Sequence, residues 1–131
     1  MRTLFLVVLV ASVTALPATK KAQQPKPPAI AVLETAAHRD QDRLNIDARI
    51  KNTGERQATD IVIIVDVLDS DKNPLTTQKG SSDPESLDPG QEGEFHAQLP
   101  LPPRAVFIRL SFEDGGARDI KATNTGPFAI D

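Results

Sequence analysis

The sequence predicts an all-β domain, an antiparallel sandwich of about seven strands of the immunoglobulin or fibronectin-III type. Three observations predict it. From residue 30 onward, apolar residues recur at every second position, which is the period of a half-buried strand. Eleven prolines and seven glycines are spread between these stretches as turn signals. Aromatic residues make up only 4% of the chain, so aliphatic side chains must form the core, and Val and Ile among them favour strands.

The alternation places the individual strands. It is cleanest over 43–51, where polar residues alternate with Leu44, Ile46, Ala48 and Ile50. The stretch 60–68 is apolar on both faces, with Ile61, Ile63, Val65 and Val67 on the inner one, and 106–113 points Val106, Ile108, Leu110 and Phe112 inward. We expect the tail 127–131 either to pack back onto the domain or to fray. The expected strands are 30–34, 43–51, 60–68, 75–79, 94–99, 106–113 and 118–123.

The first fifteen residues have the pattern of a signal peptide. Arg2 is followed by the apolar run 4–11 and by small or branched residues that predict cleavage after Ala15. The apolar run is too short for a membrane anchor, which needs about 20 residues. Residues 16–29 show no periodicity and carry four prolines with Lys20, Lys21 and Lys26, so we expect a disordered linker ahead of a domain over 30–131. The chain is therefore expected to be extracytoplasmic, periplasmic or secreted, with no transmembrane segment after signal removal.

Charge and cysteine content narrow the function classes. Residues 30–131 hold 11 basic and 18 acidic residues, a formal charge of −7, which argues against nucleic acid as a partner. The chain has no cysteine, which excludes disulfides, thiolate metal sites and a cysteine nucleophile. Copper binding would favour Met or His clusters and sugar binding exposed Trp or Tyr, and the sequence has neither.

No motif predicts an enzyme, a metal site or a cofactor. The stretch 69–73 begins like a calcium loop, but Pro74 and Gly80 stand where such a loop needs Gly and Glu, so we expect a hairpin turn. The only histidines are His38, expected in a loop, and His96, expected to face outward between Glu94 and Gln98. Both are expected to be surface residues. The sequence contains no nucleophile elbow, phosphate loop or H-E-x-x-H motif.

The order of residues over 30–123 resembles the FxLYD-type domain, a fibronectin-III-like sandwich of exported bacterial proteins. The matching elements are Asn52-Thr53-Gly54, then Ala58, then Val65-Asp66-Val67-Leu68-Asp69, and later Leu87-Asp88-Pro89-Gly90 with Gly93-Glu94-Phe95. Val65 and Leu68 stand where the motif has Phe and Tyr. The resemblance implies a small extracytoplasmic accessory or interaction module without catalytic residues.

One face stands out as a candidate binding surface. In a sandwich of this type the strands 60–68 and 106–113 pair, which would bring Asp66 and Arg109 close enough for an ion pair. Exposed apolar patches often mark binding surfaces, although the N-terminal segment or the tail 127–130 could instead cover this one. We expect a non-enzymatic module that binds another envelope or secreted protein, or itself. The alternative is a stalk-like envelope domain tethered through its basic linker. The candidate interaction face consists of Val62, Ile64, Asp66, Leu68, Phe107 and Arg109.

Overall fold

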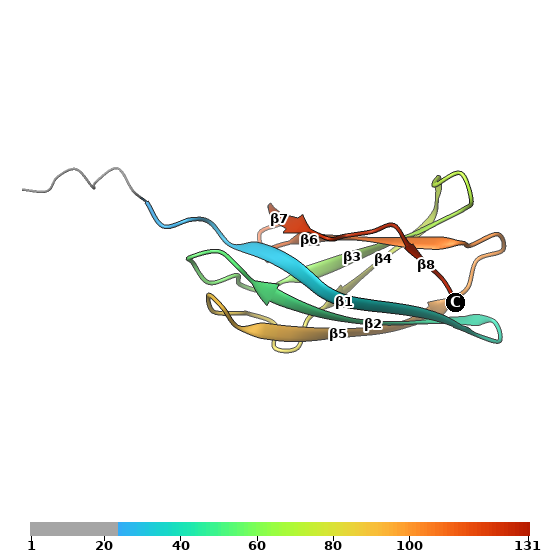
Figure 1. Cartoon of the computed structure of the whole chain (residues 1–131), viewed down its shortest axis with the longest axis horizontal. Helices are drawn as coiled ribbons and strands as arrows, with labels where there is room; N and C mark the ends of the chain where they lie inside the picture. Colours follow the sequence, from blue (N-terminus) through green and yellow to red (C-terminus); the bar gives the residue numbers. More distant parts are fainter. Residues whose placement is uncertain (1–23) are drawn as a thin grey trace, which may run out of the picture.

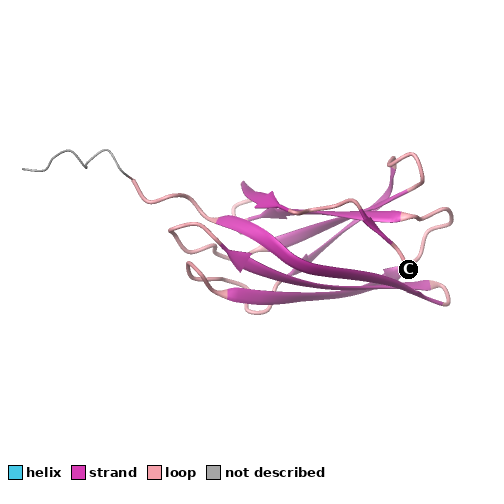
Figure 2. Ribbon diagram, viewed as in Figure 1, coloured by secondary structure: helices cyan, strands magenta, loops and turns pink. Residues whose placement is uncertain are grey.

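A computed structural model describes residues 24–131, and these form an all-β domain, as predicted (Figures 1 and 2). The predicted signal peptide and residues 16–23 of the linker lie outside the described residues. Within 24–131, no helix is long and apolar enough to cross a membrane. The strands are β1 (Ala29–Asp40), β2 (Arg43–Asn52), β3 (Val62–Leu68), β4 (Pro74–Ser81), β5 (Glu92–Pro100), β6 (Phe107–Glu113), β7 (Asp119–Thr123) and β8 (Phe128–Ala129).

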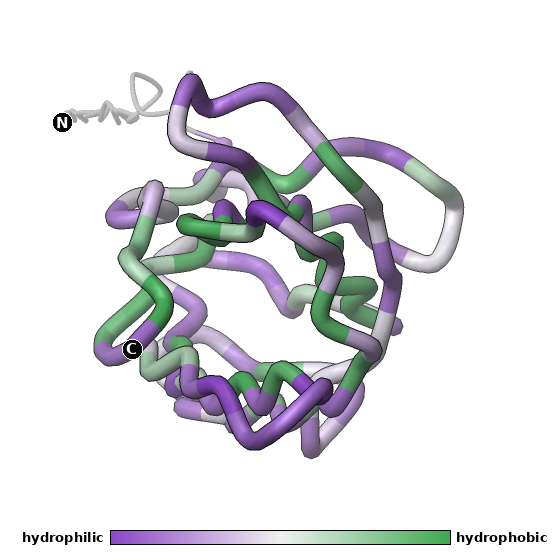
Figure 3. Tube along the Cα trace, turned by 90° about the vertical axis from the view of Figure 1, so that its right-hand side faces the viewer, coloured by the Kyte–Doolittle hydropathy of each residue, from purple (hydrophilic) through white to green (hydrophobic). Residues whose placement is uncertain are grey.

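The strands form one continuous mixed sheet instead of the purely antiparallel arrangement that we expected. Its order is β4-β3-β6-β7-β1-β2-β5, with β8 also paired to β6. The exception to antiparallel pairing is Ala29–Ala31 of β1, which runs parallel to Lys121–Thr123 of β7. A register shift between Val32 and Glu34 follows this short contact, and such a bulge bends a strand. The first residues of β1 can therefore join β7 while the rest pairs with β2, and the sheet curls almost closed (Figure 3).

The inward rows predicted from the alternation form the core. In β2 and β3 all the predicted inward side chains are buried, and Ile108, Leu110 and Phe112 of β6 are buried as well. Val106, predicted to point inward with them, is only half-buried. Each fully buried Ile, Leu or Phe side chain contributes about 1.5–3 kcal/mol relative to an exposed one. The largest fully buried side chains are Phe95, Phe112, Ile30, Leu44, Ile46, Ile50, Ile61, Ile63, Leu68, Leu87, Ile108 and Leu110.

β1 is much longer than predicted, and the loop expected at His38 is wrong because His38 lies within this strand. The bulge at Val32/Glu34 shifts the phase of the alternation. Beyond it the row that contains the buried Ala37 consists of Thr35, Ala37 and Arg39, which gives no apolar period to detect. Arg39 is exposed at the end of this row, and its Nη2 donates a hydrogen bond to the Ala105 carbonyl, 2.7 Å away.

The predicted Asn52-Thr53-Gly54 turn is built around a buried asparagine. The Asn52 side chain donates to the carbonyls of Arg56 and Leu87, both at 2.9 Å, and its Oδ1 accepts from the Gly54 N–H at 2.9 Å. Gly54 has no room for a side chain, since a Cβ there would lie 2.1 Å from the Pro27 carbonyl oxygen. The Glu55 N–H also donates to the Lys26 carbonyl at 3.1 Å. Contacts with the domain therefore begin before the expected boundary at Ile30.

The C-terminal tail packs back, which settles the two outcomes that we left open for it. Phe128 lies opposite Ile108 and Ala129 opposite Phe107 on β6. The Ile130 N–H then donates to the Val106 carbonyl at 2.9 Å, and Ile130 is buried. The C-terminus lies at the far end of the long axis from residues 24–28 (Figure 1).

Candidate functional site

The outer face of β3 and β6 is assembled as the sequence predicted. The two strands pair antiparallel, with Asp66 opposite Arg109 and Leu68 opposite Phe107. The expected ion pair is present, with Arg109 Nη2 3.9 Å from Asp66 Oδ2. The Arg109 side chain is 43% exposed and the Asp66 side chain 24%, so water screens this pair and its own contribution to stability is small.

The apolar part of this face is smaller than expected. Val62, Ile64 and Phe107 are half-buried, whereas Leu68 is fully buried and is not available to a partner. The reason is the register shift between β3 and β4 at Val67/Leu68, which breaks the alternation so that both residues are buried. Among residues 24–131 the one large apolar side chain classed as exposed is Leu33, at 36%, which lies at the β1 bulge and not on this face.

Polar side chains from β4 and β6 frame these apolar positions. The Thr77 hydroxyl donates to Asp66 Oδ1 at 2.7 Å, which continues the Asp66–Arg109 pair onto β4. Lys79 lies opposite Ile64, and its Nζ is 3.7 Å from Glu113 Oε1, beside Val62. The Lys79 side chain therefore crosses the aliphatic row. This arrangement explains why the row is half-buried although it faces solvent.

Neither residues 24–29 nor the C-terminal tail lies over this face. The tail extends the sheet at the edge of β6 through β8, and Phe128 packs against the core. The N-terminal segment lies against the turn after β2, where Lys26 and Pro27 contact Glu55 and Gly54. The sequence left open whether the N-terminal segment or the tail covers this face. Residues 24–29 and residues 127–130 both lie elsewhere.

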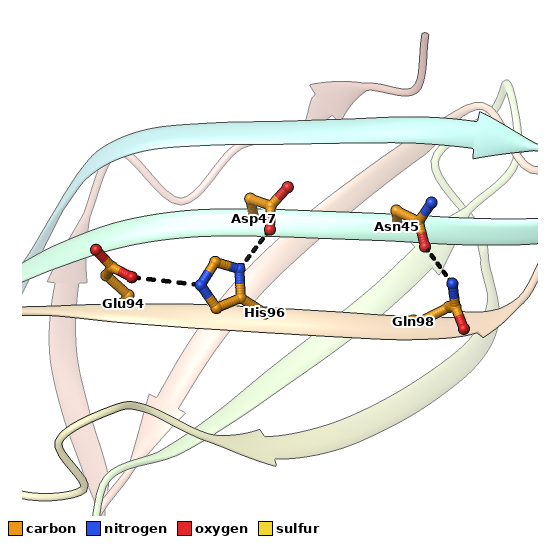
Figure 4. Close-up of polar contacts among 5 residues, drawn as sticks. All are labelled: Asn45, Asp47, Glu94, His96 and Gln98. Carbon is orange, nitrogen blue, oxygen red and sulfur yellow. Dashed lines mark hydrogen bonds and ion pairs between the residues drawn. The ribbon is translucent and has the colours of Figure 1, made fainter.

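The outer face of β2 and β5 has a different character, because its residues are polar throughout. Asn45, Asp47, Arg49 and Lys51 of β2 lie opposite Gln98, His96, Glu94 and Glu92 of β5. Figure 4 shows the centre of this face, where Gln98 Nε2 donates to Asn45 Oδ1 at 2.8 Å and His96 lies between two carboxylates. Sequence reasoning placed His96 on the surface correctly but missed its partner Asp47, because only the cross-strand register brings the two together.

His96 has a raised pKa, and its two carboxylate neighbours are the cause. Its Nδ1 lies 2.5 Å from Asp47 Oδ1, and its Nε2 lies 3.3 Å from Glu94 Oε1. The hydrogen bond with Asp47, followed by the one with Glu94, holds the pKa of His96 above its ordinary value. The imidazole is 64% exposed, so it exchanges protons directly with water.

His38 and His96 do not form a metal site together. They line one shallow hollow with Asn45 and Asp47, but β2 separates the two strands that carry them. His38 Nδ1 instead lies 3.7 Å from Asp131 Oδ2 at the C-terminus. Within residues 24–131 no group of three or more His, Asp or Glu side chains is arranged to hold a metal ion.

Comparison with known proteins gives distant likenesses to solved structures alone. No protein-family profile matches the chain, and no curated protein sequence matches it. The structure of IrmA from Escherichia coli is similar at a TM-score of 0.45 and 12% sequence identity, over 82% of this chain and 99% of the IrmA chain.

Proposed function

We propose that this chain is an exported, non-enzymatic module that binds another protein through the outer face of β3 and β6. The observation that carries the proposal is the contrast between its two outer faces. On β2 and β5 the paired outer positions from 45 to 51 and 92 to 98 are all polar, whereas on β3 and β6 they include Val62, Ile64 and Phe107. Here the apolar side chains lie on either side of the Asp66–Arg109 pair, and solvent-facing aromatic and aliphatic side chains next to an Arg are common in protein interfaces.

The charged residues of this face allow the partner to be a different protein or a second copy of the chain. Asp66 and Arg109 lie side by side at the centre of the face, with Lys79 and Glu113 beyond Ile64. A twofold interface brings the same patch of two copies together, and neighbouring opposite charges can then pair with each other across it. The charge of −7 on residues 30–131 opposes such self-association at low salt.

For the fold in finer terms, we infer an immunoglobulin or fibronectin-III-like sandwich of the FxLYD type. Two layers, β4-β3-β6 and β1-β2-β5, face each other across the core, and β4 and β5 at the ends of the path are not paired, which supports this inference. The buried Asn52 and the close packing at Gly54 give the Asn-x-Gly element a structural role. Export rests on the signal-peptide pattern of residues 1–15.

A stalk-like envelope domain is the second candidate function. The observation that favours it is the position of the chain ends, since residues 24–28 and Asp131 lie at opposite ends of the long axis (Figure 1). A tether with Lys20, Lys21 and Lys26 would then contact an anionic polymer or lipid. Deleting 16–29 from a stalk should abolish envelope attachment, while the domain stays monomeric.

The test of the proposed binding face is a charge placed at one of its apolar side chains. We expect Phe107→Asp to reduce association at least about tenfold, which corresponds to about 1.4 kcal/mol, whether the partner is captured from the extracytoplasmic fraction or is a second copy detected by sedimentation. The control Asn45→Asp puts the same group on the polar outer face, and circular dichroism verifies that both variants fold. Equal association by both variants would refute the proposed face.

A further inference from the structure

The sheet is incomplete at one seam, between β4 and β5. These strands are the two ends of the pairing path, and they lie beside each other around the core without a ladder between them. Among residues 24–131 the backbone bridges the seam at one point: the Asp83 N–H donates to the Glu94 carbonyl at 2.8 Å, and the Glu94 N–H donates to the Asp83 carbonyl at 3.0 Å. The edge of β5 therefore accepts an extended backbone at Glu94.

Past Glu94 the same edge continues without a partner. Backbone groups of alternate residues in an antiparallel strand point to the same side. Those of Glu94 point away from β2, so those of His96 and Gln98 do as well. Among residues 24–131 neither His96 nor Gln98 has a backbone partner on that side. Two N–H and two C=O groups are thus presented at the spacing that an added β-strand requires.

A hollow of about 190 Å³ lies beside this edge. Val65, Gly80, Phe95, Ala97 and Leu99 form its apolar part, and polar residues of β4 and β5, Lys79 among them, line the rest. Ala97 is the smallest of these β5 side chains and is half-buried. A residue opposite Ala97 on an added strand would point to the same side, into the hollow. A cavity of about 150 Å³ can hold benzene, so one large aliphatic or aromatic side chain fits here.

The charges on the outer side of the edge favour a cationic neighbour. Asp47 and Glu94 pair only with His96, and Asp83 has no ion-pair partner in the described part of the chain. Arg49 does not neutralise them, because it pairs with Glu34 and Glu92. A side chain opposite His96 would lie on this outer side, close to carboxylates that no Lys or Arg among residues 24–131 pairs with.

From these observations we infer that the β5 edge at His96 and Gln98 docks an extended polypeptide segment that adds to the sheet as a strand. The segment places an apolar side chain opposite Ala97, in the hollow, and a Lys or Arg opposite His96. The docking site lies on a different surface from the β3–β6 face. The inference can therefore be tested independently of the proposed function.

Amide NMR titration of the chain over residues 16–131 with a nine-residue peptide of alternating Val and Lys, blocked at both ends, tests the inference. We expect shift changes centred on residues 96–99 and Gly80. The same peptide with Glu in place of Lys should bind at least about tenfold more weakly. Two further peptides carry N-methyl groups on alternate residues, one on the odd-numbered and the other on the even-numbered positions. One of these two should lose binding, because its methyl groups replace the N–H groups that face β5. No binding at millimolar peptide, or shift changes centred on Phe107, would overturn the inference. Concentration-dependent shifts at the β5 edge without peptide would also contradict it, because a second copy would then be the occupant.

Two variants at one position isolate the backbone contribution. Gln98→Pro removes an N–H that points away from β2, and proline is tolerated on such an edge, so we expect the fold to persist and the peptide to bind about tenfold more weakly. Gln98→Val keeps the N–H and should bind like the original chain. Phe107→Asp should leave peptide binding unchanged, although it weakens association through the β3–β6 face. Equal peptide affinity in the Pro and Val variants would refute strand addition, and the N-methylated peptides keep the test valid if the Pro variant does not fold.

Discussion

Replacing Asn52 by Ala tests how the turn after β2 organises this end of the domain. The Asn52 side chain is fully buried and makes three hydrogen bonds of 2.9 Å, two as a donor and one as an acceptor, besides a longer one of 3.4 Å from the Ala29 N–H. In the variant, the N–H of Gly54, a buried residue, loses its acceptor. A buried donor without a partner costs about 1–3 kcal/mol, and each of the other two bonds is worth about 0.5–1.5 kcal/mol.

These contributions do not all act in full. The Leu87 carbonyl keeps a second partner in the Ala58 N–H, 2.9 Å away, and Arg56 is exposed, so water can replace its lost donor. We therefore expect Asn52→Ala to lower the free energy of unfolding by about 2–4 kcal/mol. Such a loss is a large fraction of the typical stability of a small domain.

Equilibrium unfolding in urea, followed by far-ultraviolet circular dichroism, measures this loss as a lower midpoint at unchanged slope. The matched control is Asn45→Ala, which removes the same amide from the outer face, where it accepts one hydrogen bond from Gln98. We expect the control to cost less than about 0.5 kcal/mol. If the two variants lost equal stability, the buried asparagine would not be what holds the turn.

Two further predictions concern the histidine on the polar face and a close contact in the seam. The pKa of His96, followed by NMR, should lie above that of an unstructured His and should fall in Asp47→Asn. Because the pKa is higher in the folded state, the stability that His96 adds is fully present at a pH below the unfolded pKa. This stability is lost as the pH rises through the folded pKa. An unchanged His96 pKa in that variant would contradict the assigned contact. Gly80→Ala should cost about 1–3 kcal/mol in urea unfolding because its Cβ would lie 2.7 Å from the Phe95 ring, whereas Gly116→Ala, with its nearest atom at 3.4 Å, should be nearly neutral.

The alternation was sufficient to predict the strands whose two faces differ in polarity. In β2, β3 and β6 the inward rows were predicted correctly, and once β3 and β6 pair, the position of Asp66 opposite Arg109 follows. Hydrophobic burial fixes the register of such strands, because a slip by one residue would turn the whole apolar row to water.

The same reasoning failed where a bulge changes the phase. The shift at Val32/Glu34 hid the second half of β1, and the shift at Val67/Leu68 buried a residue that we had placed on the outer face. Bulges depend on how two strands fit together, so a pattern within one strand does not reveal them. The contact between His96 and Asp47 was missed for a related reason. The two residues are 49 positions apart in the sequence, and only the pairing of β2 with β5 brings them together.

A signal for the unpaired seam was nevertheless present in the sequence. Pro74 begins β4 and Pro100 ends β5, and no other strand contains a proline. Since proline lacks the N–H that a ladder needs, it is confined to edge strands, strand ends and bulges. These two strands are the ones that end the sheet path. The prolines limit the length of each free edge, so that on β5 only His96 and Gln98 stay open between the Asp83 bridge and Pro100. An edge this short can pair with a brief extended segment but offers little to the long strand contacts that drive aggregation.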